Sequence, residues 1–549
     1  MSFAVLQVED LSVSLTGSPA LRKVVDGVSF EVRMGETVCL VGESGSGKSV
    51  TALSVMGLLS RTGLATSEGR VLVDNENVLE ASERRVRELR ATRMAMVFQE
   101  PMTALNPVQS VGRQIDEVLR VHSKLNGVER RERVLAMLDS VHLANVTKLY
   151  DTYPHELSGG QRQRIVISMA LILEPRLLIA DEPTTALDVT TQNQILLLIR
   201  ELQEKQNTAV LLITHDFGVV AEVAKRIVVM RNGRVVEIGE RAEILTRPRE
   251  SYTRLLVSSV PSLIPKQRAR VSGETILDVR GLAKTYVERR LFGGGRIVTA
   301  AEDVNLTVRR GEIVGIVGES GSGKSTVARC IVRLIDPTAG VVSIRGEDIA
   351  RVARRPLRRL RQHFQIVFQD PYRSLNPRRT VGDSIVEGLI NFGMARSEAM
   401  VRGSELLRTV GLDSDVMGRY PHQFSGGQRQ RICIARALAL EPDLLIADEA
   451  VSALDVSVQA QVLKLLEDIR AVTGVGVLFI THDLRVAAQI CDTIVVMQNG
   501  CIVESGVAAT VLTAPQHDYT RLLIDAAPGR NWDFQNFKPI ESTASIAAR

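Results

Sequence analysis

The chain has 549 residues, of which 45% are hydrophobic and 24% are charged, and its formal net charge is +5. This length is too great for a single hydrophobic core and suits two domains of roughly 250 residues each. The composition is that of a globular protein, and so mild a basic excess does not argue for a nucleic-acid partner.

Short apolar stretches and scattered cysteines argue against a membrane-spanning, secreted or disulfide-bonded protein. The longest apolar runs, such as residues 165–173 and 476–480, fall far short of the roughly 20 residues that cross a bilayer, so we expect no spanning segment. The first ten residues lack a basic flank followed by an apolar core, so we expect no secretion signal. No CxxC pair occurs, which favours reduced and mostly buried thiols in a cytosolic protein. The cysteines are Cys39, Cys330, Cys433, Cys491 and Cys501.

One series of motifs occurs twice along the chain. The string VGESGSGKS stands at residues 41–49 and again at 317–325. In the first half it is followed by VFQEP at 97–101, LSGGQRQR at 157–164, LLIADE at 177–182 and ITHD at 213–216. In the second half it is followed by VFQDP at 367–371, FSGGQRQR at 424–431, LLIADE at 444–449 and ITHD at 480–483. The offset shrinks only from 276 residues between Lys48 and Lys324 to 267 between Ser158 and Ser425. Each half is therefore a complete copy of one domain.

The glycine-rich string fits the phosphate-binding pattern G-x-x-x-x-G-K-[ST]. An apolar strand feeds it and an apolar helix leaves it, so its N–H groups can surround a polyphosphate at the helix N-terminus. Lys48 is expected to neutralise the β and γ oxygens of ATP, and Ser49 to offer its hydroxyl to Mg²⁺. A chance glycine-rich turn is the alternative, which two matches in register make negligible. The candidate ATP-binding residues are Gly42, Ser44, Gly45, Gly47, Lys48, Ser49 and Val50, and in the second half Gly318, Ser320, Gly321, Gly323, Lys324, Ser325 and Thr326.

An acidic pair ends the apolar strand in each LLIADE motif. The first carboxylate, Asp181 or Asp448, is placed to hold Mg²⁺ directly or through water. The second, Glu182 or Glu449, is placed to polarise a water for attack on the γ-phosphorus. The alternative for both glutamates is a solvated position on the surface.

The SGGQ motif lies shortly before an acidic strand, after a VFQ and before an isolated histidine, and this order resembles the nucleotide-binding domains of ATP-binding-cassette (ABC) proteins. The resemblance covers nearly the whole chain, twice. It implies an α/β fold of two tandem P-loop NTPase domains, each with a RecA-like core, an antiparallel β subdomain and a helical subdomain. It also implies that the two halves pair head to tail around two ATP molecules.

The resemblance assigns further roles at each site. SGGQ of one half would meet the γ-phosphate held by the other half's lysine, because a serine and two glycines at a helix N-terminus form a second anion site. These residues are Ser158, Gly159, Gly160 and Gln161, facing Lys324, and Ser425, Gly426, Gly427 and Gln428, facing Lys48. The glutamines Gln99 and Gln369 would touch Mg²⁺ and water, and the histidines His215 and His482 would contact the γ-phosphate. The acids of TALD and SALD, Asp188 and Asp455, resemble residues that bridge the two domains.

A finer match concerns the subfamily. The strings VFQEPMTALNP and VFQDPYRSLNP, with the tails RPRESYTRLLV and APQHDYTRLLI, resemble the ATPases of dipeptide, oligopeptide, nickel and glutathione importers. This chain resembles two such ATPases fused. The expected partners are two integral membrane permease subunits and an extracytoplasmic solute-binding protein, at the cytoplasmic face of the inner membrane. The alternatives are a sugar importer's fused ATPase and a soluble twin-cassette ATPase of ribosomes.

The sequence departs from the family pattern at three places. Tyr286 is positioned to stack on adenine, but its counterpart in the first half is Leu15, so base stacking at the first site is in doubt. Ala450 replaces the proline seen as Pro183, while the acidic pair before it is kept. Many relatives carry a cysteine-rich C-terminal segment, but neither residues 261–274 nor residues 532–549 contain cysteine, so no iron–sulfur cluster is expected.

The domain boundaries follow from the repeat. We expect a first ATP-binding domain over 1–257, a linker over 258–274, a second domain over 275–526 and a tail over 527–549. The linker lacks periodicity and carries Pro, Ser and Arg, which is typical of a tether. The arginine run at 351–362 is interpreted as a solvated helix face, with contact to lipid headgroups or a partner as the alternative.

Overall fold

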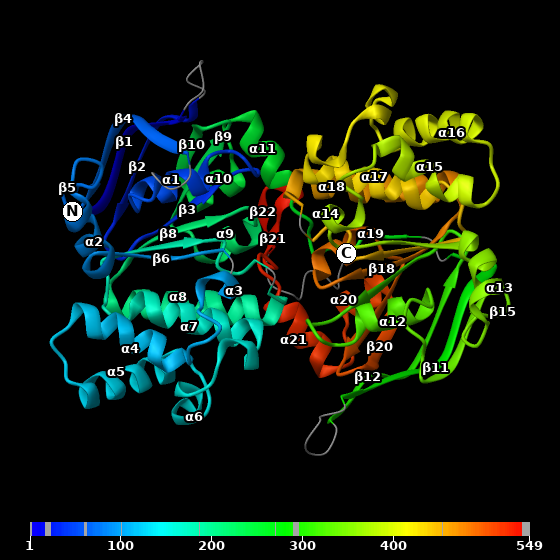
Figure 1. Cartoon of the computed structure of the whole chain (residues 1–549). Coiled ribbons are helices and arrows are strands. Elements are labelled where there is room, and N and C mark those ends of the chain that lie inside the picture. Colours follow the sequence, from blue (N-terminus) through cyan, green and yellow to red (C-terminus); the bar gives the residue numbers. More distant parts are fainter. Residues whose placement is uncertain are drawn as a thin grey trace. The chain divides into compact units, whose positions relative to one another are not determined.

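The computed structural model divides into two compact units (Figure 1). Met1–Val260 and Phe534–Pro539 belong to the first unit, and Pro261–Asp533 with Ile540 belong to the second. The structure describes residues 3–16, 23–59, 63–99, 101–185, 187–268, 271–288, 296–452 and 454–540. Two stretches lie outside the described residues: 541–549, the end of the predicted tail, and 289–295, in the second half before its phosphate loop.

A six-stranded sheet forms the centre of the first unit, in the order β10-β9-β3-β8-β7-β6. All neighbours run parallel except β10, which pairs antiparallel to β9. Strands β3, β7 and β8 are buried along their whole length, as expected for a parallel sheet covered on both faces. The strands are β3 (Thr37–Val41), β6 (Met94–Val97), β7 (Leu177–Asp181), β8 (Ala209–Thr214), β9 (Arg226–Arg231) and β10 (Arg234–Glu240).

A second, antiparallel sheet has the order β2-β1-β4-β5 and shares one apolar core with the central sheet. Its strands are β1 (Ala4–Leu15), β2 (Lys23–Arg33), β4 (Leu64–Val73) and β5 (Glu76–Asn77).

Helices complete the first unit, and those from α3 to α7 form the predicted helical subdomain between the glutamine motif and SGGQ (Figure 1). They are α1 (Lys48–Val55), α2 (Glu83–Thr92), α3 (Pro101–Ala104), α4 (Val111–His122), α5 (Gly127–Ser140), α6 (Val146–Tyr150), the 3-10 turn η2 (Pro154–Glu156), α7 (Gly159–Leu171), α8 (Val189–Gln206), α9 (Phe217–Val223), α10 (Arg241–Thr246) and α11 (Ser251–Ser258).

The second unit repeats this plan, with sheets β12-β11-β14-β15 and β16-β17-β18-β13-β19-β20. The predicted α/β fold with an antiparallel subdomain and a helical subdomain is therefore confirmed in each unit. The strands are β11 (Thr275–Glu288), β12 (Arg296–Arg309), β13 (Ile313–Val317), β14 (Ala339–Ile344), β15 (Glu347–Asp348), β16 (Phe364–Val367), β17 (Leu444–Asp448), β18 (Gly476–Thr481), β19 (Thr493–Gln498) and β20 (Cys501–Val507).

The helices of the second unit follow in the same order. They are α12 (Lys324–Ile331), α13 (Arg354–Leu360), η3 (Arg361–His363), α14 (Pro371–Ser374), α15 (Val381–Asn391), α16 (Arg396–Thr409), η4 (Ser414–Gly418), η5 (Pro421–Gln423), α17 (Gly426–Leu438), α18 (Val456–Thr473), α19 (Leu484–Ile490), α20 (Ala508–Thr513) and α21 (Asp518–Ala526). The last elements of the described residues are β21 (Trp532–Asp533), η6 (Phe534–Asn536) and β22 (Lys538–Pro539).

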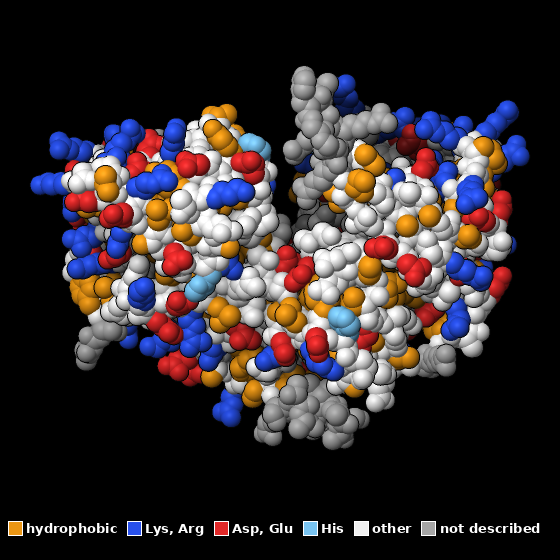
Figure 2. All heavy atoms as spheres, turned by 90° about the horizontal axis from the view of Figure 1, so that it is seen from below, with side chains coloured by type: hydrophobic (Ala, Val, Ile, Leu, Met, Phe, Trp, Pro, Cys, Tyr) orange, Lys and Arg blue, Asp and Glu red, His pale blue; other side chains and the backbone are white. Residues whose placement is uncertain are grey.

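Surface charge shows no extended patch of one sign on the face in Figure 2, where basic and acidic side chains are interspersed. The arginine run forms α13, whose arginines are exposed while Leu357 is buried, as predicted for a solvated helix face. None of the helices in the described residues is both long and apolar enough to traverse a bilayer. All five cysteines are free thiols, and Cys501 alone among them is not fully buried.

Candidate functional site

Each glycine-rich loop joins the C-terminal end of a buried strand to a helix, β3 to α1 and β13 to α12. Gly45 and Gly47 have φ of 79° and 101°, in the left-handed region that favours glycine. A Cβ on Gly42 would lie 2.3 Å from the Met230 carbonyl oxygen, whereas a Cβ on Gly45 would meet nothing within 4 Å. Gly42 is thus required by close backbone packing, and Gly45 by its conformation alone. The second loop repeats this pattern at Gly318 and Gly321.

The loop lysines are buried and curl back over their own loops. Lys48 Nζ donates to the carbonyl oxygens of Gly42 at 2.7 Å and Glu43 at 2.9 Å. Lys324 Nζ donates to those of Gly318 and Glu319, both at 2.7 Å. Each ammonium group is therefore held by two carbonyl oxygens of its own loop, where a bound phosphate would meet it.

The first carboxylate of each acidic pair reaches the serine at the start of the phosphate-loop helix. Ser49 Oγ donates to Asp181 Oδ1 at 3.3 Å, and Ser325 Oγ donates to Asp448 Oδ1 at 3.0 Å. Burial raises the pKa of Asp181, and the neighbouring Glu182 charge adds to the rise although Ser49 opposes it. The pKa of Asp448 is raised in the same way. A buried carboxylate beside a hydroxyl provides hard oxygen donors, which fit Mg²⁺.

The second carboxylate of the first pair, Glu182, is held by three side chains. Gln99 Nε2 donates to its Oε2 at 2.8 Å and Thr185 Oγ1 donates to the same oxygen at 2.9 Å. His215 Nδ1 lies 2.9 Å from Oε1. Burial would raise the pKa of Glu182, but the bonds from His215 and Thr185 and the Lys48 charge outweigh it and lower the pKa to about 2. The carboxylate is therefore ionised, and its side chain is 16% exposed, so water has access to it.

Glu449, the counterpart of Glu182 in the second unit, has fewer close hydrogen-bond donors. Gln369 Nε2 donates to its Oε2 at 2.7 Å, and His482 Nδ1 lies 3.5 Å from that oxygen. Ser452, the counterpart of Thr185, donates to the backbone oxygen of Glu449 instead of the carboxylate. Burial raises the pKa of Glu449, but His482 and Lys324 outweigh it, so the net pKa is lowered. Glu182 and Glu449 also share φ near 50°, which is uncommon for a residue with a side chain and marks a constrained site.

The SGGQ serines cap helices rather than pointing freely into solvent. Ser158 Oγ accepts from the Gln161 backbone N–H at 3.3 Å, while Gln161 Oε1 accepts from the Ser158 N–H at 3.0 Å. Ser425 and Gln428 form the same reciprocal pair. These capping boxes fix the first turn of α7 and α17 and aim its remaining N–H groups outward, as an anion site requires. Asp188 caps α8 within its own unit by accepting from the Thr191 N–H at 2.9 Å.

A tyrosine that motif reasoning left without a role stands behind each phosphate loop. The Glu43 backbone N–H donates to the Tyr252 phenol oxygen, whose O–H in turn reaches Glu43 Oε2, both at 3.3 Å. The Glu319 N–H donates to the Tyr519 oxygen at 3.1 Å. Burial raises the pKa of Tyr252 to about 12. The repeated YTRLL string at both positions was the signal that could have identified them.

Replacing Tyr252 or Tyr519 by Phe should lower the thermal midpoint of its unit by a few degrees. The loop N–H would lose a buried partner, which costs about 1–3 kcal/mol, and each kcal/mol shifts a domain of this size by about 2–4 °C. Tyr420→Phe is the matched control, since Tyr420 is 42% exposed and stacks on His422. Differential scanning calorimetry gives the midpoints, and equal midpoints for all three variants would contradict the role of the loop bond.

The two positions expected at adenine are both partly open. Tyr286, in β11, is 38% exposed with Lys284 Nζ 5.1 Å from its ring centre, and Leu15, at the end of β1, is 39% exposed. Both side chains thus present apolar surface. Only Tyr286 presents an aromatic face.

Comparisons with known proteins agree with this geometry. The family model described as "ABC transporter" matches residues 25–185 and 301–452, and that described as "Oligopeptide/dipeptide transporter, C-terminal region" matches 236–290 and 503–547. The peptidoglycan transport ATP-binding protein YejF of Agrobacterium fabrum is 45% identical over 95% of this chain and 96% of its own length. The glutathione import ATP-binding protein GsiA of Escherichia coli is 45% identical over 95% of this chain and 89% of its own length.

Proposed function

The chain belongs to the ABC transporter family, and from that premise we propose that it is the ATP-hydrolysing subunit of a membrane importer for peptides or related small solutes. Members of this family hydrolyse ATP, and the protein is an ATPase. The observation that carries the proposal is the repeated cluster of glutamine, glutamate and histidine at the end of a buried strand, beside a lysine-bearing phosphate loop.

At each site, some residues bind the nucleotide and Mg²⁺, and others act on the attacking water. Lys48 and the loop N–H groups hold the β- and γ-phosphates, and Asp181 with Ser49 and Gln99 would hold Mg²⁺. The metal ion, when bound, neutralises charge that develops on the phosphate oxygens. Glu182 orients and polarises the attacking water, and His215 holds the carboxylate and the γ-phosphate in register. Lys324, Asp448, Glu449 and His482 repeat these roles with Ser325 and Gln369.

The outward N–H groups of the SGGQ turns support pairing between the halves. A phosphate loop alone leaves one side of the γ-phosphate open to water. SGGQ of the other half would cover that side and complete the anion site, so that two ATP molecules would close the pair and hydrolysis would reopen it. Fusion into one chain keeps the halves at roughly millimolar effective concentration, which favours this pairing.

Relatives named for peptidoglycan and glutathione transport, together with the oligopeptide/dipeptide region, favour a peptide-type solute. A sugar importer's ATPase and a ribosomal twin-cassette ATPase are not favoured by these matches. The partners would be two permease subunits and an extracytoplasmic binding protein, with this chain peripheral at the cytoplasmic face of the inner membrane. The solute itself is selected by those partners.

Co-purification tests the proposal directly. The chain should fractionate with membranes when its permease partners are co-expressed, and detergent extraction should recover a complex that hydrolyses ATP. The Glu182→Gln, Glu449→Gln double variant is the control, because it should assemble equally well without turnover. Recovery of the chain on ribosomes or nucleic acid instead would contradict an importer role.

The adenine positions predict unequal affinity at the two sites. Aromatic stacking on a base is worth about 1–3 kcal/mol, or roughly tenfold in affinity per 1.4 kcal/mol, and only the second site has a tyrosine for it. Tyr286→Ala should therefore raise the ATP concentration for half-maximal turnover about tenfold, whereas Leu15→Ala should change it much less. Leu15→Tyr should tighten the first site. Equal losses from both alanine variants in an ATP titration would show that phosphate contacts alone decide the affinity.

A further inference from the structure

The helix after the histidine of each ITHD motif begins beside the candidate ATP site. This helix is α9 in the first unit and α19 in the second, and the turn before it is the same in both. The N–H of Asp216 or Asp483 donates to the threonine hydroxyl two positions earlier at 3.0 Å. The carboxylate of the same residue caps the helix by accepting the N–H two positions later at 2.8 Å. This turn therefore sets the position of the histidine within it.

Arg485 makes the turn of the second unit different from that of the first. Its counterpart 267 positions earlier is Gly218, which has no side chain. The Arg485 guanidinium donates to both carboxylate oxygens of Asp483, from Nη2 to Oδ2 at 2.9 Å and from Nε to Oδ1 at 3.1 Å. Its Nη1 donates to the carbonyl oxygen of Pro528 at 3.2 Å. One side chain thus joins the cap of α19 to the segment that follows α21.

The bridge made by Arg485 is largely shielded from solvent. The side chain of Arg485 is 8% exposed, that of Asp483 is 19% exposed, and Pro528 is buried. A two-pronged pair between arginine and a carboxylate is stronger and more directional than a single ion pair, and burial leaves it little screened by salt. The bridge therefore restrains Asp483 and, through the backbone, the adjacent His482.

The far end of α19 is held by the predicted linker. Gln489 Nε2 donates to the carbonyl oxygens of Ser262 at 2.8 Å and Ile264 at 3.2 Å. The Lys266 N–H donates to the Ala488 carbonyl oxygen at 3.3 Å. All seven residues of α19 are buried. The helix is therefore fixed at both ends, by a segment before the second domain and by a segment after α21.

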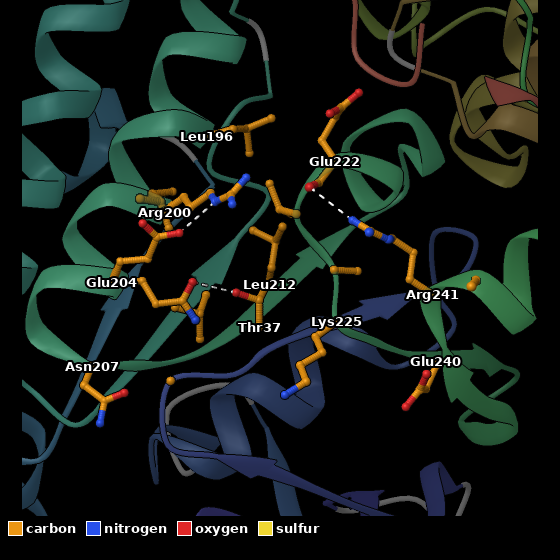
Figure 3. A pocket seen from close by; sticks show the side chains of 17 residues that line it. Thr37, Leu196, Arg200, Glu204, Asn207, Leu212, Glu222, Lys225, Glu240 and Arg241 are labelled. Carbon is orange, nitrogen blue, oxygen red and sulfur yellow. Dashed lines mark hydrogen bonds and ion pairs between the residues drawn. The ribbon is translucent and has the colours of Figure 1, made fainter. Parts of the chain in front are cut away.

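The corresponding end of α9 is open in the first unit. Glu222, the counterpart of Gln489, is exposed. With Leu196 and Arg200 of α8 and with Lys225, it lines a cavity of about 710 Å³ (Figure 3). Among the described residues, α9 is therefore less restrained than α19 at both ends.

The second site is also the one with the longer distance between histidine and glutamate. His215 Nδ1 lies 2.9 Å from Glu182 Oε1. His482 Nδ1 lies 3.5 Å from Glu449 Oε2, and a contact of that length restrains a ring less. The orientation of His482 therefore depends more on its own backbone turn, which is the part that Arg485 holds.

We propose that Arg485 is a positioning residue of the second ATP site, which joins Asp483 to the segment at Pro528 and so fixes the backbone of His482 opposite Glu449. This inference rests on the proposed role of His482 at the γ-phosphate. It makes turnover at the second site depend on the segment after α21, through a bond that the first site, with Gly218, cannot form.

Steady-state ATP turnover of the full-length chain tests the proposal, with filter binding of ATP and calorimetry on the same preparations. A misplacement of about 1 Å can cost about 100-fold in rate, so Arg485→Gln should lower kcat about fivefold or more. The ATP concentration for half-maximal turnover should stay unchanged, because the phosphate loop is untouched. Asp483→Asn keeps an oxygen that can cap α19 and should lower kcat to a similar extent. The double variant should lose no more than the larger single loss, since both changes break one bridge.

Three further variants complete the experiment. Arg485→Lys keeps a cation beside Asp483 but not the two-pronged geometry, so its kcat should lie between those of the parent chain and Arg485→Gln. Arg530→Gln removes an arginine of the same C-terminal segment, one that pairs with Asp525, and should leave kcat unchanged. His482→Ala should lower kcat at least as much as Arg485→Gln. Asp483→Asn decides the matter if Arg485→Gln does not fold.

The proposal is overturned if Arg485→Gln and Asp483→Asn keep the kcat of the parent chain, or if their losses add in the double variant. It is equally overturned if kcat falls only in proportion to ATP binding or to folded protein, because that result indicates general destabilisation. A loss with His482→Ala but none with Arg485→Gln would contradict the positioning role alone. A silent His482→Ala would contradict the proposed role of the histidine, and the positioning role with it.

Discussion

Replacing Glu182 by Gln should lower ATP turnover roughly 10²–10⁴-fold while ATP stays bound, which is the usual contribution of a positioned acid–base group. The amide keeps the shape of the carboxylate but lacks its charge, so it polarises water poorly. Lys48 and the glycine loop are untouched and still hold the phosphates. Glu449→Gln should have an effect of the same order, because Gln369 and His482 surround Glu449 as Gln99 and His215 surround Glu182.

Single-turnover kinetics and filter binding of labelled ATP separate the two effects in the assembled transporter. Glu117→Gln is a suitable control, since Glu117 is an exposed glutamate on α4 paired only with Arg120 among the described residues. If one of the two catalytic substitutions proved silent, the sites would not be equivalent. The longer distance from His482 to Glu449 would then be the first cause to test.

The repeated motifs predicted the fold and most of the site because each carries a local requirement. Left-handed glycines, a buried apolar strand ending in acids and a serine capping box are properties of neighbouring residues, so the sequence displays them directly. The convergence of Gln99, Glu182 and His215 follows from strand order, since parallel strands end at one edge of a sheet.

Features set by distant packing could not be predicted in this way. Thr185 donates to a carboxylate while its counterpart Ser452 donates to a backbone oxygen, although the two motifs look interchangeable. The linker shows the same limit: its proline and lack of periodicity indicated a tether, yet Gln489, more than 200 positions later, fixes its backbone. Local pattern says that a segment is not a helix or a strand. It does not say that the segment is loose.

The two glycines of each SGGQ motif are alike in sequence but have different roles in the structure. A Cβ on Gly427 would lie 2.2 Å from Val458 Cγ1 on α18, and one on Gly160 would lie 2.5 Å from Thr191 Cγ2 on α8. A Cβ on Gly426 would meet only Leu454 Cδ2 at 4.0 Å. Gly427 is thus required for the packing of α17 on α18. The space beside Gly426 is open, so packing does not require glycine there.

Gly427→Ala should therefore destabilise the second unit by about 1–3 kcal/mol, because Val458 is β-branched and cannot easily turn away within a helix. At about 2–4 °C per kcal/mol, its thermal midpoint should fall by several degrees, with turnover lost in proportion to unfolded protein. Gly426→Ala should keep or raise the midpoint, since Ala favours helix over Gly by about 1 kcal/mol, and yet lower turnover by covering an N–H that would face the γ-phosphate in the proposed pairing of the halves. Adding Val458→Ala should restore the midpoint of Gly427→Ala but not the turnover of Gly426→Ala. Calorimetry and ATP turnover measured on the same preparations distinguish the two effects, and equal midpoints for the two single variants would show that the helix contact does not set the need for glycine at 427.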